Sequence, residues 1–339
     1  MGEEKVGEKH MIGSASAPSV EYHPPKFMAE IGCNHMVTTR PARRIPRAAV
    51  TRVCACVSRA RARQGDMAIA KDLLKIAYLQ GADYAKFQKR NPKELLTKEQ
   101  YDAPHPNPRN SYGETYGEHR EFLEFSVEQH RELKAYCGEL GLGYSCSVWD
   151  TTSAKEIVSL KPDLIKVGSP SNQHFEMQAV LRDEYAGDVH ISTGMTTREE
   201  IEGIVRFWEE KGQAKRVVLY NCTSGYPVPF EDVCMLEIRY LHETYKDRVK
   251  LIGFSGHHLG IAIDVAAYAL GATWFERHFT KDRTWKGTDH AASLEPTGLG
   301  KLIRDLKAAH KCMSFKPTAI LDIEQPQRKK LKWGQYNKA

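Results

Sequence analysis

Ten polar or charged residues stand at or just past the ends of short apolar segments. They are Glu30, Lys86, Gln88, Ser147, Lys166, Ser169, Ser192, Asn221, His257 and His278. Burying a polar group without a partner is costly, so one such residue at the end of every apolar segment is hard to explain by packing alone. The lysines supply cations, and the hydroxyls and amides supply oriented donors, which together suit an anionic ligand.

Two histidines of this set, His257 and His278, follow consecutive apolar segments. A pair of neighbouring imidazoles that is open to water suits a divalent metal ion with vacant positions. His258 directly follows His257 and is a competing candidate. A single histidine in such a place is more often a hydrogen-bonded structural residue, so the metal hypothesis depends on the pair.

The apolar segments that carry these residues have the composition of β-strands covered on their outer faces. We expect strands at residues 27–31, 84–88, 144–148, 164–167, 189–192, 217–220, 250–253 and 273–276. Helical spacing of apolar residues occurs between them, at residues 67–80, 127–140, 198–211, 230–245, 261–270 and 297–312. A further helix that runs to Leu160 has Thr151 or Ser153 as its candidate N-cap.

Eight strands that are each followed by a helix predict a (β/α)8 TIM barrel. In that fold the reacting groups lie at the carboxyl ends of the strands, which is where the polar residues fall. The alternative is an open, doubly wound α/β sheet. It is less favoured because no GxGxxG turn follows the first predicted strand.

Bulk composition is that of a globular protein, with 41% hydrophobic and 27% charged residues. No apolar run reaches the roughly 18 residues of a transmembrane helix, and the N-terminal residues lack the apolar core of a signal peptide. The eight cysteines form no CxxC pair, so we expect reduced, mostly buried thiols rather than a zinc or thioredoxin-like site. We therefore expect a cytoplasmic protein that does not act at a membrane.

The formal net charge of +6 comes from one short stretch. Residues 37–64 contain eight arginines, no lysine and no acidic residue, so the rest of the chain is slightly acidic. The basic excess is therefore local, and a nucleic-acid footprint over the whole surface is not supported. The charge distribution therefore does not predict a nucleic-acid partner.

Eight short motifs resemble, in order, those of the sialic acid synthase family, the phosphoenolpyruvate-dependent nonulosonate synthases. They are MAEIGCNH, AKFQ, IKVGS, STGM, NCTSGYP, GFSGHH, ERHFT and GTDHAASLEP. The resemblance extends from about residue 26 to about residue 315, apart from the arginine-rich stretch. One tetrapeptide would be weak support, but eight in order at predicted strand ends are specific.

The resemblance implies an enzyme that joins phosphoenolpyruvate to N-acetylmannosamine or mannose, or to a 6-phosphate of either, and releases phosphate. It implies that Lys86, Gln88, Ser147, Lys166, Ser169, Ser192, Asn221, Tyr226, Ser255 and Asp289 bind the substrates. It also implies Mn²⁺ or Mg²⁺ at His257 and His278, acting as a Lewis acid on the sugar aldehyde. Glu30 would position the aldehyde and manage protons or water, and the enzyme would be a homodimer.

The sequence departs from the family pattern at two site positions. Gly256 replaces the aspartate that usually precedes the metal histidine, which weakens the expected support for His257. Ser171 stands where a glutamate commonly contacts the sugar, which leaves the sugar open.

We expect three segments: a tail at residues 1–22, a barrel at 23–318 and a second tail at 319–339, without the antifreeze-like domain common in the family. Residues 37–64 interrupt the first strand–helix connection, where the family has only a one- or two-residue link. Our favoured explanation is a retained intron. A eukaryotic intron begins with GT and ends with AG; the stretch begins with valine, whose codons start with GT, and ends with glutamine, whose codons may end in AG. The alternative is a genuine basic loop that binds an anionic partner.

Two other functions remain open from the sequence. One is a different condensation of phosphoenolpyruvate with an aldose, as in the octulosonate and heptulosonate synthases that share the barrel. The NCTSGYP and GTDHAASLEP motifs argue against it. The other is a degenerate barrel that serves as a binding protein, which the presence of Glu30, both lysines and both histidines opposes.

Overall fold

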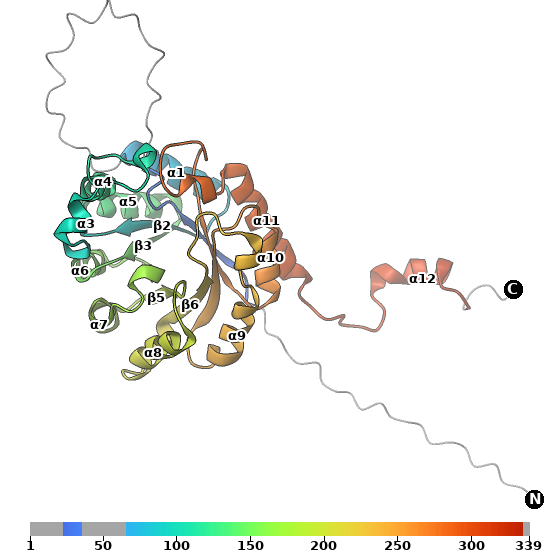
Figure 1. Ribbon diagram of the computed structural model, residues 1–339. Helices are drawn as coiled ribbons and strands as arrows, with labels where there is room; N and C mark the ends of the chain where they lie inside the picture. Colours follow the sequence, from blue (N-terminus) through green and yellow to red (C-terminus); the bar gives the residue numbers. More distant parts are fainter. Residues whose placement is uncertain (1–22, 36–65, 335–339) are drawn as a thin grey trace, which may run out of the picture.

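The computed structural model describes residues 23–35 and 66–334. The arginine-rich stretch and the expected N-terminal tail lie outside these residues. Eight parallel strands form a closed barrel in sequence order, with β8 paired to β1 (Figure 1). The strands are β1 (Lys26–Glu30), β2 (Tyr84–Lys89), β3 (Gly143–Val148), β4 (Leu164–Val167), β5 (Asp188–Ser192), β6 (Val217–Cys222), β7 (Leu251–Gly256) and β8 (Trp274–His278). The predicted TIM barrel is confirmed.

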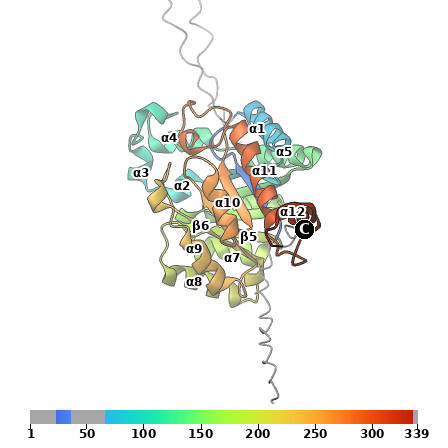
Figure 2. The ribbon, with the colours of Figure 1, turned by 90° about the vertical axis from the view of Figure 1, so that its right-hand side faces the viewer.

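Eight helices alternate with the strands and surround the barrel (Figures 1 and 2). They are α1 (Met67–Leu79), α5 (Val127–Leu140), α6 (Thr151–Ser159), α7 (Phe175–Glu184), α8 (Arg198–Glu209), α9 (Leu236–Tyr245), α10 (Ala262–Ala269) and α11 (Pro296–Cys312). Local sequence fixes several starts: Thr197 and Glu200 form a capping box at α8. The N-cap of α6 is Asp150, not Thr151 or Ser153, because its carboxylate accepts from the Ser153 amide at 2.7 Å.

Three short helices extend the connection between β2 and α5, and the periodicity of the sequence did not predict them. They are α2 (Pro92–Leu95), α3 (Lys98–Asp102) and α4 (Tyr116–Leu123). Beyond the barrel, α12 (Gln325–Leu331) has no buried residue and lies apart from the other helices (Figure 1). None of the helices in the described part of the chain combines the length and apolarity needed to cross a membrane.

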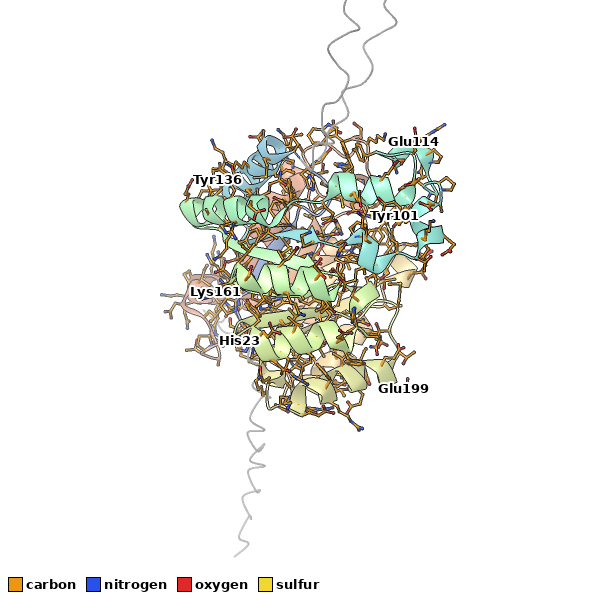
Figure 3. The ribbon with its side chains drawn as sticks, turned by 90° about the vertical axis from the view of Figure 1, so that its left-hand side faces the viewer. His23, Tyr101, Glu114, Tyr136, Lys161 and Glu199 are labelled. Atoms are coloured by element: carbon orange, nitrogen blue, oxygen red, sulfur yellow. The ribbon has the colours of Figure 1, made fainter. Side chains whose placement is uncertain are left out.

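The two ends of the barrel differ in what the chain places there. His23 and Lys161 precede β1 and β4 and lie toward one end, whereas Tyr101, Glu114 and Glu199 follow β2 and β5 and lie toward the other (Figure 3). The second end is therefore the carboxyl face, where a TIM barrel carries its chemistry. The α2–α4 insertion lies at that face.

The barrel interior changes character along its axis. Strand side chains alternate in direction, so every second residue points inward. At the amino end the inward residues form an apolar layer that includes Met28, Leu164 and Trp274. Two positions further along the same strands stand Glu30, Lys166 and Glu276, all buried. The main core, between strands and helices, is mostly apolar. The fold thus concentrates charge at the carboxyl end of the barrel.

Four of the six cysteines in the described residues are buried, as expected, and none of these six forms a disulfide. The buried ones are Cys33, Cys137, Cys146 and Cys222, and the exposed ones are Cys234 and Cys312.

Candidate active site

The predicted site residues gather at the carboxyl mouth of the barrel. Strand pairing places Glu30 opposite Lys86 in the β1–β2 ladder and opposite His278 in the β1–β8 ladder. It also places Ser147 beside both Gln88 and Lys166. Nine of the predicted residues are buried: Glu30, Lys86, Ser147, Lys166, Ser192, Asn221, Ser255, His257 and His278. Gln88, Ser169 and Asp289 are half-buried, and Tyr226 is 51% exposed.

The centre of the site is a buried cluster of two lysines and two glutamates. Lys166 Nζ lies 3.0 Å from both carboxylate oxygens of Glu276, and Lys86 Nζ lies 3.8 Å from Oε2 of the same residue. Lys86 also contacts the carboxylate of Glu30 and donates to Ser147 Oγ at 2.6 Å. The two cations therefore stay close together because two carboxylates compensate their charges.

Burial sets the protonation of this cluster. It lowers the pKa of Lys86 to about 8, and Lys166 adds to the decrease while Glu276 opposes it. Burial disfavours the charged form of Glu276, but the two lysines outweigh it and hold the pKa of that carboxyl well below its usual range. Ser255 Oγ donates to Glu276 Oε1 at 3.0 Å and so supports the charged form.

Glu276 is a site residue that the sequence reasoning missed. It belongs to the ERHFT motif, but no role was assigned to it. The signal that could have found it is its position two residues before His278, on the same inward face of β8.

The side chains of Glu30, Gln88 and Asp289 lie around Gly32. Gln88 Nε2 donates to Glu30 Oε1 at 2.9 Å. A Cβ atom on Gly32 would lie 2.7 Å from Glu30 Oε1, 3.0 Å from Gln88 Nε2 and 3.5 Å from Asp289 Oδ2. Gly32 also has a φ of +48°, which favours glycine. Its small size lets Glu30, Gln88 and Asp289 converge on one point.

His257 and His278 lie side by side, with ring centroids 5.2 Å apart. His257 Nδ1 donates to the carbonyl of Thr223 at 2.9 Å, which leaves the lone pair of the neutral ring on Nε2. His278 Nδ1 is buried without a hydrogen-bond partner and lies 3.7 Å from Asp289 Oδ2. Burial lowers the pKa of His278 to about 4, although Asp289 opposes the shift, so this ring is neutral at neutral pH. The ring centroid of the exposed Tyr226 lies 4.3 Å from that of His257.

His258 turns away from this pair. Its Nε2 lies 3.2 Å from Asp264 Oδ2, and Arg277 contacts both side chains. Gly256 allows this arrangement, since a Cβ there would lie 2.8 Å from the Phe254 ring and 3.0 Å from the His258 ring. An aspartate at position 256 would not fit without a shift, and the Thr223 carbonyl orients His257 instead.

The residues could hold a divalent cation through two imidazoles. No group of three or more histidine, cysteine, aspartate or glutamate side chains in residues 23–35 and 66–334 has a metal-binding arrangement. A cation here would therefore have two protein ligands and several positions for water or substrate, as a Lewis acid requires. An available Nε2 on His257 and an unpartnered Nδ1 on His278 fit that use.

The neutral donors of the site are only partly engaged. Asn221 Nδ2 is buried without a partner. Ser169 Oγ accepts from the Gly194 amide at 3.0 Å and also lies 3.8 Å from the thiol of Cys222, which the sequence reasoning did not assign to the site. Buried donors that lack partners are expected where a ligand completes the hydrogen bonding.

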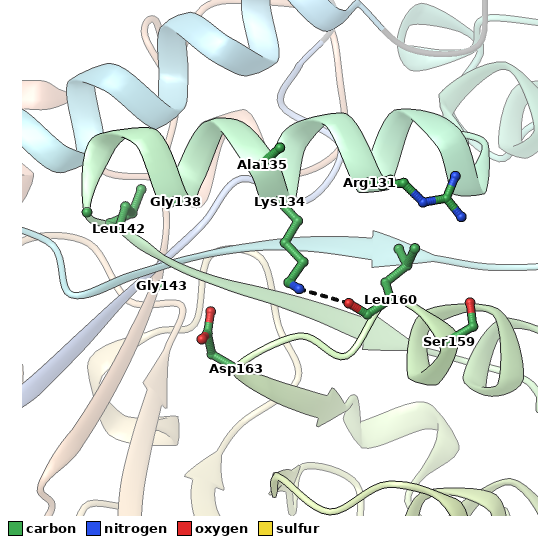
Figure 4. A pocket seen from close by; sticks show the side chains of 10 residues that line it. Arg131, Lys134, Ala135, Gly138, Leu142, Gly143, Ser159, Leu160 and Asp163 are labelled. Carbon is green, nitrogen blue, oxygen red and sulfur yellow. Dashed lines mark hydrogen bonds between the residues drawn. The ribbon is translucent and has the colours of Figure 1, made fainter.

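One large cavity lies away from the predicted site residues. A cavity of about 650 Å³ lies between α5 and α6, lined by Arg131, Lys134 and Asp163, where Lys134 Nζ donates to the Leu160 carbonyl at 2.9 Å (Figure 4). Gly143 begins β3 and Asp163 directly precedes β4, so this cavity lies at the opposite end of the barrel from the site. It contains none of the predicted site residues.

A closed parallel barrel with a buried charged cluster at the carboxyl ends of its strands has the architecture of a TIM-barrel enzyme. Residues 73–317 match the NeuB family. The chain is 34% identical over 309 residues to N-acetylneuraminate-9-phosphate synthase of Homo sapiens, covering 91% of this chain and 77% of the relative. It is 31% identical over 251 residues to N,N'-diacetyllegionaminic acid synthase of Campylobacter jejuni, with 74% of each chain covered. The chain therefore belongs to the NeuB family, which confirms the expected sialic acid synthase family.

A solved structure agrees with the fold. The crystal structure of N-acetylneuraminic acid (sialic acid) synthetase from Leptospira borgpetersenii, in complex with citrate, superimposes with a TM-score of 0.70 at 22% identity. The match covers 94% of this chain and 97% of that chain. The match supports the barrel fold of this chain.

Proposed function

We propose that this protein is a nonulosonic acid synthase that condenses phosphoenolpyruvate with N-acetylmannosamine or mannose, or with a 6-phosphate of either, and releases inorganic phosphate. The observation that carries the proposal is the pair of buried lysines, Lys86 and Lys166, at the mouth of the barrel. A carboxylate and a phosphate on one small molecule need two close cations and oriented donors. Family membership supports the same reaction.

Phosphoenolpyruvate would lie against the two lysines. The hydroxyls of Ser147, Ser169, Ser192 and Ser255 and the unpartnered amide of Asn221 line the same mouth. Binding would replace part of the contacts that the lysines make with glutamates. A charge-assisted hydrogen bond from each lysine then fixes the orientation of the enol carbon C3.

The aldose would lie between Glu30, Asp289 and the two histidines. Mn²⁺ or Mg²⁺ held by His257 and His278 would supply Lewis-acid polarisation of the aldehyde oxygen. Asp289 would accept a hydrogen bond from a sugar hydroxyl. Glu30, with one oxygen held by Gln88, would orient the aldehyde and the attacking water.

The bond changes balance without a further co-reactant. The π electrons of the C2–C3 double bond of phosphoenolpyruvate form the bond from C3 to the aldehyde carbon, while the carbonyl π bond breaks and its oxygen takes up a proton to become a hydroxyl. Water adds at C2 and loses a proton, which Glu30 would accept, so that one proton is taken up and one released. Breakage of the C2–O bond to the phosphate then leaves a 2-keto acid and inorganic phosphate.

The test is a phosphate-release screen with phosphoenolpyruvate and a panel of aldoses, including N-acetylmannosamine, mannose, arabinose and their phosphates, with product masses recorded. Turnover with a six-carbon mannose-type sugar supports the proposal. Turnover with arabinose or its phosphate alone would assign the protein to the octulosonate type of synthase. No phosphate release with any aldose and either metal would favour a binding protein.

We further propose that the protein acts as a homodimer in the cytoplasm. Large apolar side chains are exposed on segments that follow β5, β6 and β7, among them Met195, Phe230, Leu236 and Leu259. Exposed apolar side chains of this size are often covered in an assembly. The molar mass in solution, measured by light scattering, tests the dimer.

We also propose residues 23–318 as the catalytic domain. Helix α11, which follows the last strand of the barrel, ends at Cys312. Helix α12 beyond it has no buried residue. A chain that ends at residue 318 should keep its unfolding temperature and its turnover.

A further inference from the structure

A buried arginine lies behind the two histidines, on the side of the strands that faces the helices. Arg277 directly precedes His278 on β8, and neighbouring residues of a strand point in opposite directions. Its side chain therefore points away from the barrel interior that His278 faces, and the residue is fully buried. The layer between strands and helices is mostly apolar, so a guanidinium group there is costly unless its partners offset the charge.

Arg277 reaches from β8 to the segment that follows β7. Nη2 donates to the backbone carbonyl of His258 at 2.6 Å, and Nη1 donates to the carbonyl of Gly260 at 3.0 Å. Nη1 also donates to Asp264 Oδ2 at 2.5 Å. The guanidinium group thus joins two carbonyls of one segment to a carboxylate of α10. Its donors are spread over a planar fork, a geometry that the single nitrogen of a lysine does not reproduce.

Asp264 holds the guanidinium group from the helix side. The carboxylate is fully buried in the first turn of α10, and its Oδ2 also lies 3.2 Å from His258 Nε2. Its Oδ1, the Nε of Arg277 and the Nδ1 of His258 have no hydrogen-bond partner among the described residues. Replacing a buried ion pair by apolar residues of similar volume is often neutral or even stabilising. Stability alone therefore does not account for this group.

The contacts of Arg277 begin where the pairing of the strands ends. The ladder between β7 and β8 ends with Gly256 opposite Arg277, so His257 lies just beyond it. On the other side, the amide of Val228 donates to the His257 carbonyl at 3.1 Å. His278 belongs to β8, which pairs with β1 along its whole length. Arg277 therefore supplies hydrogen bonds between the segment of His257 and the strand of His278.

We propose that Arg277 is a positioning residue of the cation site. Its guanidinium group, held by Asp264, fixes the segment after β7 against the end of β8 and so sets the spacing of the two histidines, whose ring centroids are 5.2 Å apart. The proposal rests on the proposed function, in which His257 and His278 hold the cation. Residues that orient metal ligands typically change metal affinity by about ten- to a hundredfold.

The experiment is a titration of the metal-stripped full chain with Mn²⁺, without substrates, followed by the electron paramagnetic resonance signal of free Mn²⁺. Arg277→Lys keeps the charge beside Asp264 and loses the fork that binds both carbonyls. Its dissociation constant for Mn²⁺ should rise by about ten- to a hundredfold. Turnover should recover toward the wild-type rate as Mn²⁺ is raised. At saturating Mn²⁺ the KM for phosphoenolpyruvate should stay near wild type, because Lys86 and Lys166 are unchanged.

Arg216→Lys is the matched control. Arg216 also donates to backbone carbonyls, those of Gly187 at 3.0 Å and Arg182 at 3.1 Å. It directly precedes β6 and so lies at the amino end of the barrel, away from the histidines. The control should lower the unfolding temperature and leave the dissociation constant for Mn²⁺ unchanged. An equal loss of Mn²⁺ affinity in both variants, or wild-type affinity in Arg277→Lys, would reduce Arg277 to a structural residue and overturn the proposal.

A second variant serves if Arg277→Lys does not fold. Arg277→Met combined with Asp264→Leu replaces the buried ion pair by apolar side chains, which often preserves stability. This protein should keep its fold and bind Mn²⁺ about ten- to a hundredfold more weakly than wild type. Wild-type affinity in the double variant would exclude a positioning role.

The titration also separates this proposal from the condensation. If Arg277→Lys weakens Mn²⁺ binding and the wild-type protein turns over no aldose, the condensation fails and the positioning role stands. If aldoses are turned over and the variant binds Mn²⁺ as wild type does, the positioning role fails alone. If the wild-type protein binds no Mn²⁺, the cation site and the positioning role are both overturned.

Discussion

Replacing Glu276 by glutamine tests whether the buried lysines depend on a compensating carboxylate. The substitution keeps the shape of the side chain and removes one charge. Lys166 Nζ lies 3.0 Å from both Glu276 oxygens, and the two side chains are only 2% and 6% exposed. After the change, two buried lysines share only the carboxylate of Glu30, which contacts Lys86.

The expected cost follows from this burial. Removing one partner of a buried ion pair typically costs about 3–5 kcal/mol, because the remaining charge is left uncompensated. At roughly 2 °C per kcal/mol for a protein of this size, the unfolding temperature should fall by about 6–10 °C. The free energy of unfolding should be measured by chemical denaturation as well, since the thermal transition of a large barrel is not always reversible.

The pH dependence identifies charge as the cause. A buried lysine whose pKa is lower in the folded protein than in the unfolded chain destabilises the fold at pH values below the folded pKa. The penalty shrinks as the pH rises between the two values, since the unfolded chain then binds more protons. For Lys86 these values are about 8 and 10.5. The deficit of the Glu276→Gln protein should therefore be smaller at pH 10 than at pH 7.

Phosphoenolpyruvate provides the second readout. The ligand brings the negative charge that the variant lacks, so it should raise the unfolding temperature more in Glu276→Gln than in wild type. Asp188→Asn is the control, because its ion pair with Lys250 has side chains 29% and 44% exposed and contributes about 0–1 kcal/mol. Wild-type stability in Glu276→Gln, together with an unchanged shift by phosphoenolpyruvate, would refute the compensation of the lysines by Glu276.

Three further predictions concern the chemistry. Alanine at His257 or His278 should abolish turnover and leave the fold intact, because each removes one of two proposed cation ligands; near-normal rates in metal-stripped His278→Ala protein would contradict this. Methionine at Lys86 or Lys166 should weaken phosphoenolpyruvate use by about ten- to a hundredfold in steady-state assays, and unchanged KM and kcat in both would exclude the lysines from the site. Because the pKa of Lys86 is about 8 and only the charged lysine attracts the anion, kcat/KM for phosphoenolpyruvate should fall as the pH rises through about 8. In Lys86→Arg the decrease of kcat/KM should occur at a higher pH. A pH profile that does not change in this variant would assign the decrease to another group.

The strands could be predicted because each one carries its own local signal. An apolar run that ends in a polar residue is visible in a few letters, as in β1, where Met28 and Glu30 point into the same barrel interior. The later strands were predicted too short: β7 extends to Gly256 and β8 to His278. The carboxyl ends of both strands contain polar residues that are typical of loops in sequence. In the barrel these residues nevertheless pair with the neighbouring strands.

Contacts between distant residues could not be predicted in the same way. Lys166 and Glu276 are 110 residues apart in sequence, and only the closed barrel brings their side chains together. Arg90 resembles a surface residue in sequence, since two polar residues precede it and an asparagine follows it. Its burial depends on Trp149, at the end of another strand, and on the α2–α4 insertion, whose short helices lack a periodic apolar pattern.

The charge balance of the buried cluster explains why two lysines are not enough for the site. Lys86 and Lys166 face Glu30 and Glu276, so these four side chains together carry no net charge. Phosphoenolpyruvate adds a carboxylate and a phosphate, and a buried anion without added positive charge is costly. The compensation must come from outside the four. The histidine pair on the neighbouring β7 and β8 can contribute a cation there. The proposed cation site thus lies on strands that adjoin the buried cluster and can supply the positive charge that the four side chains lack.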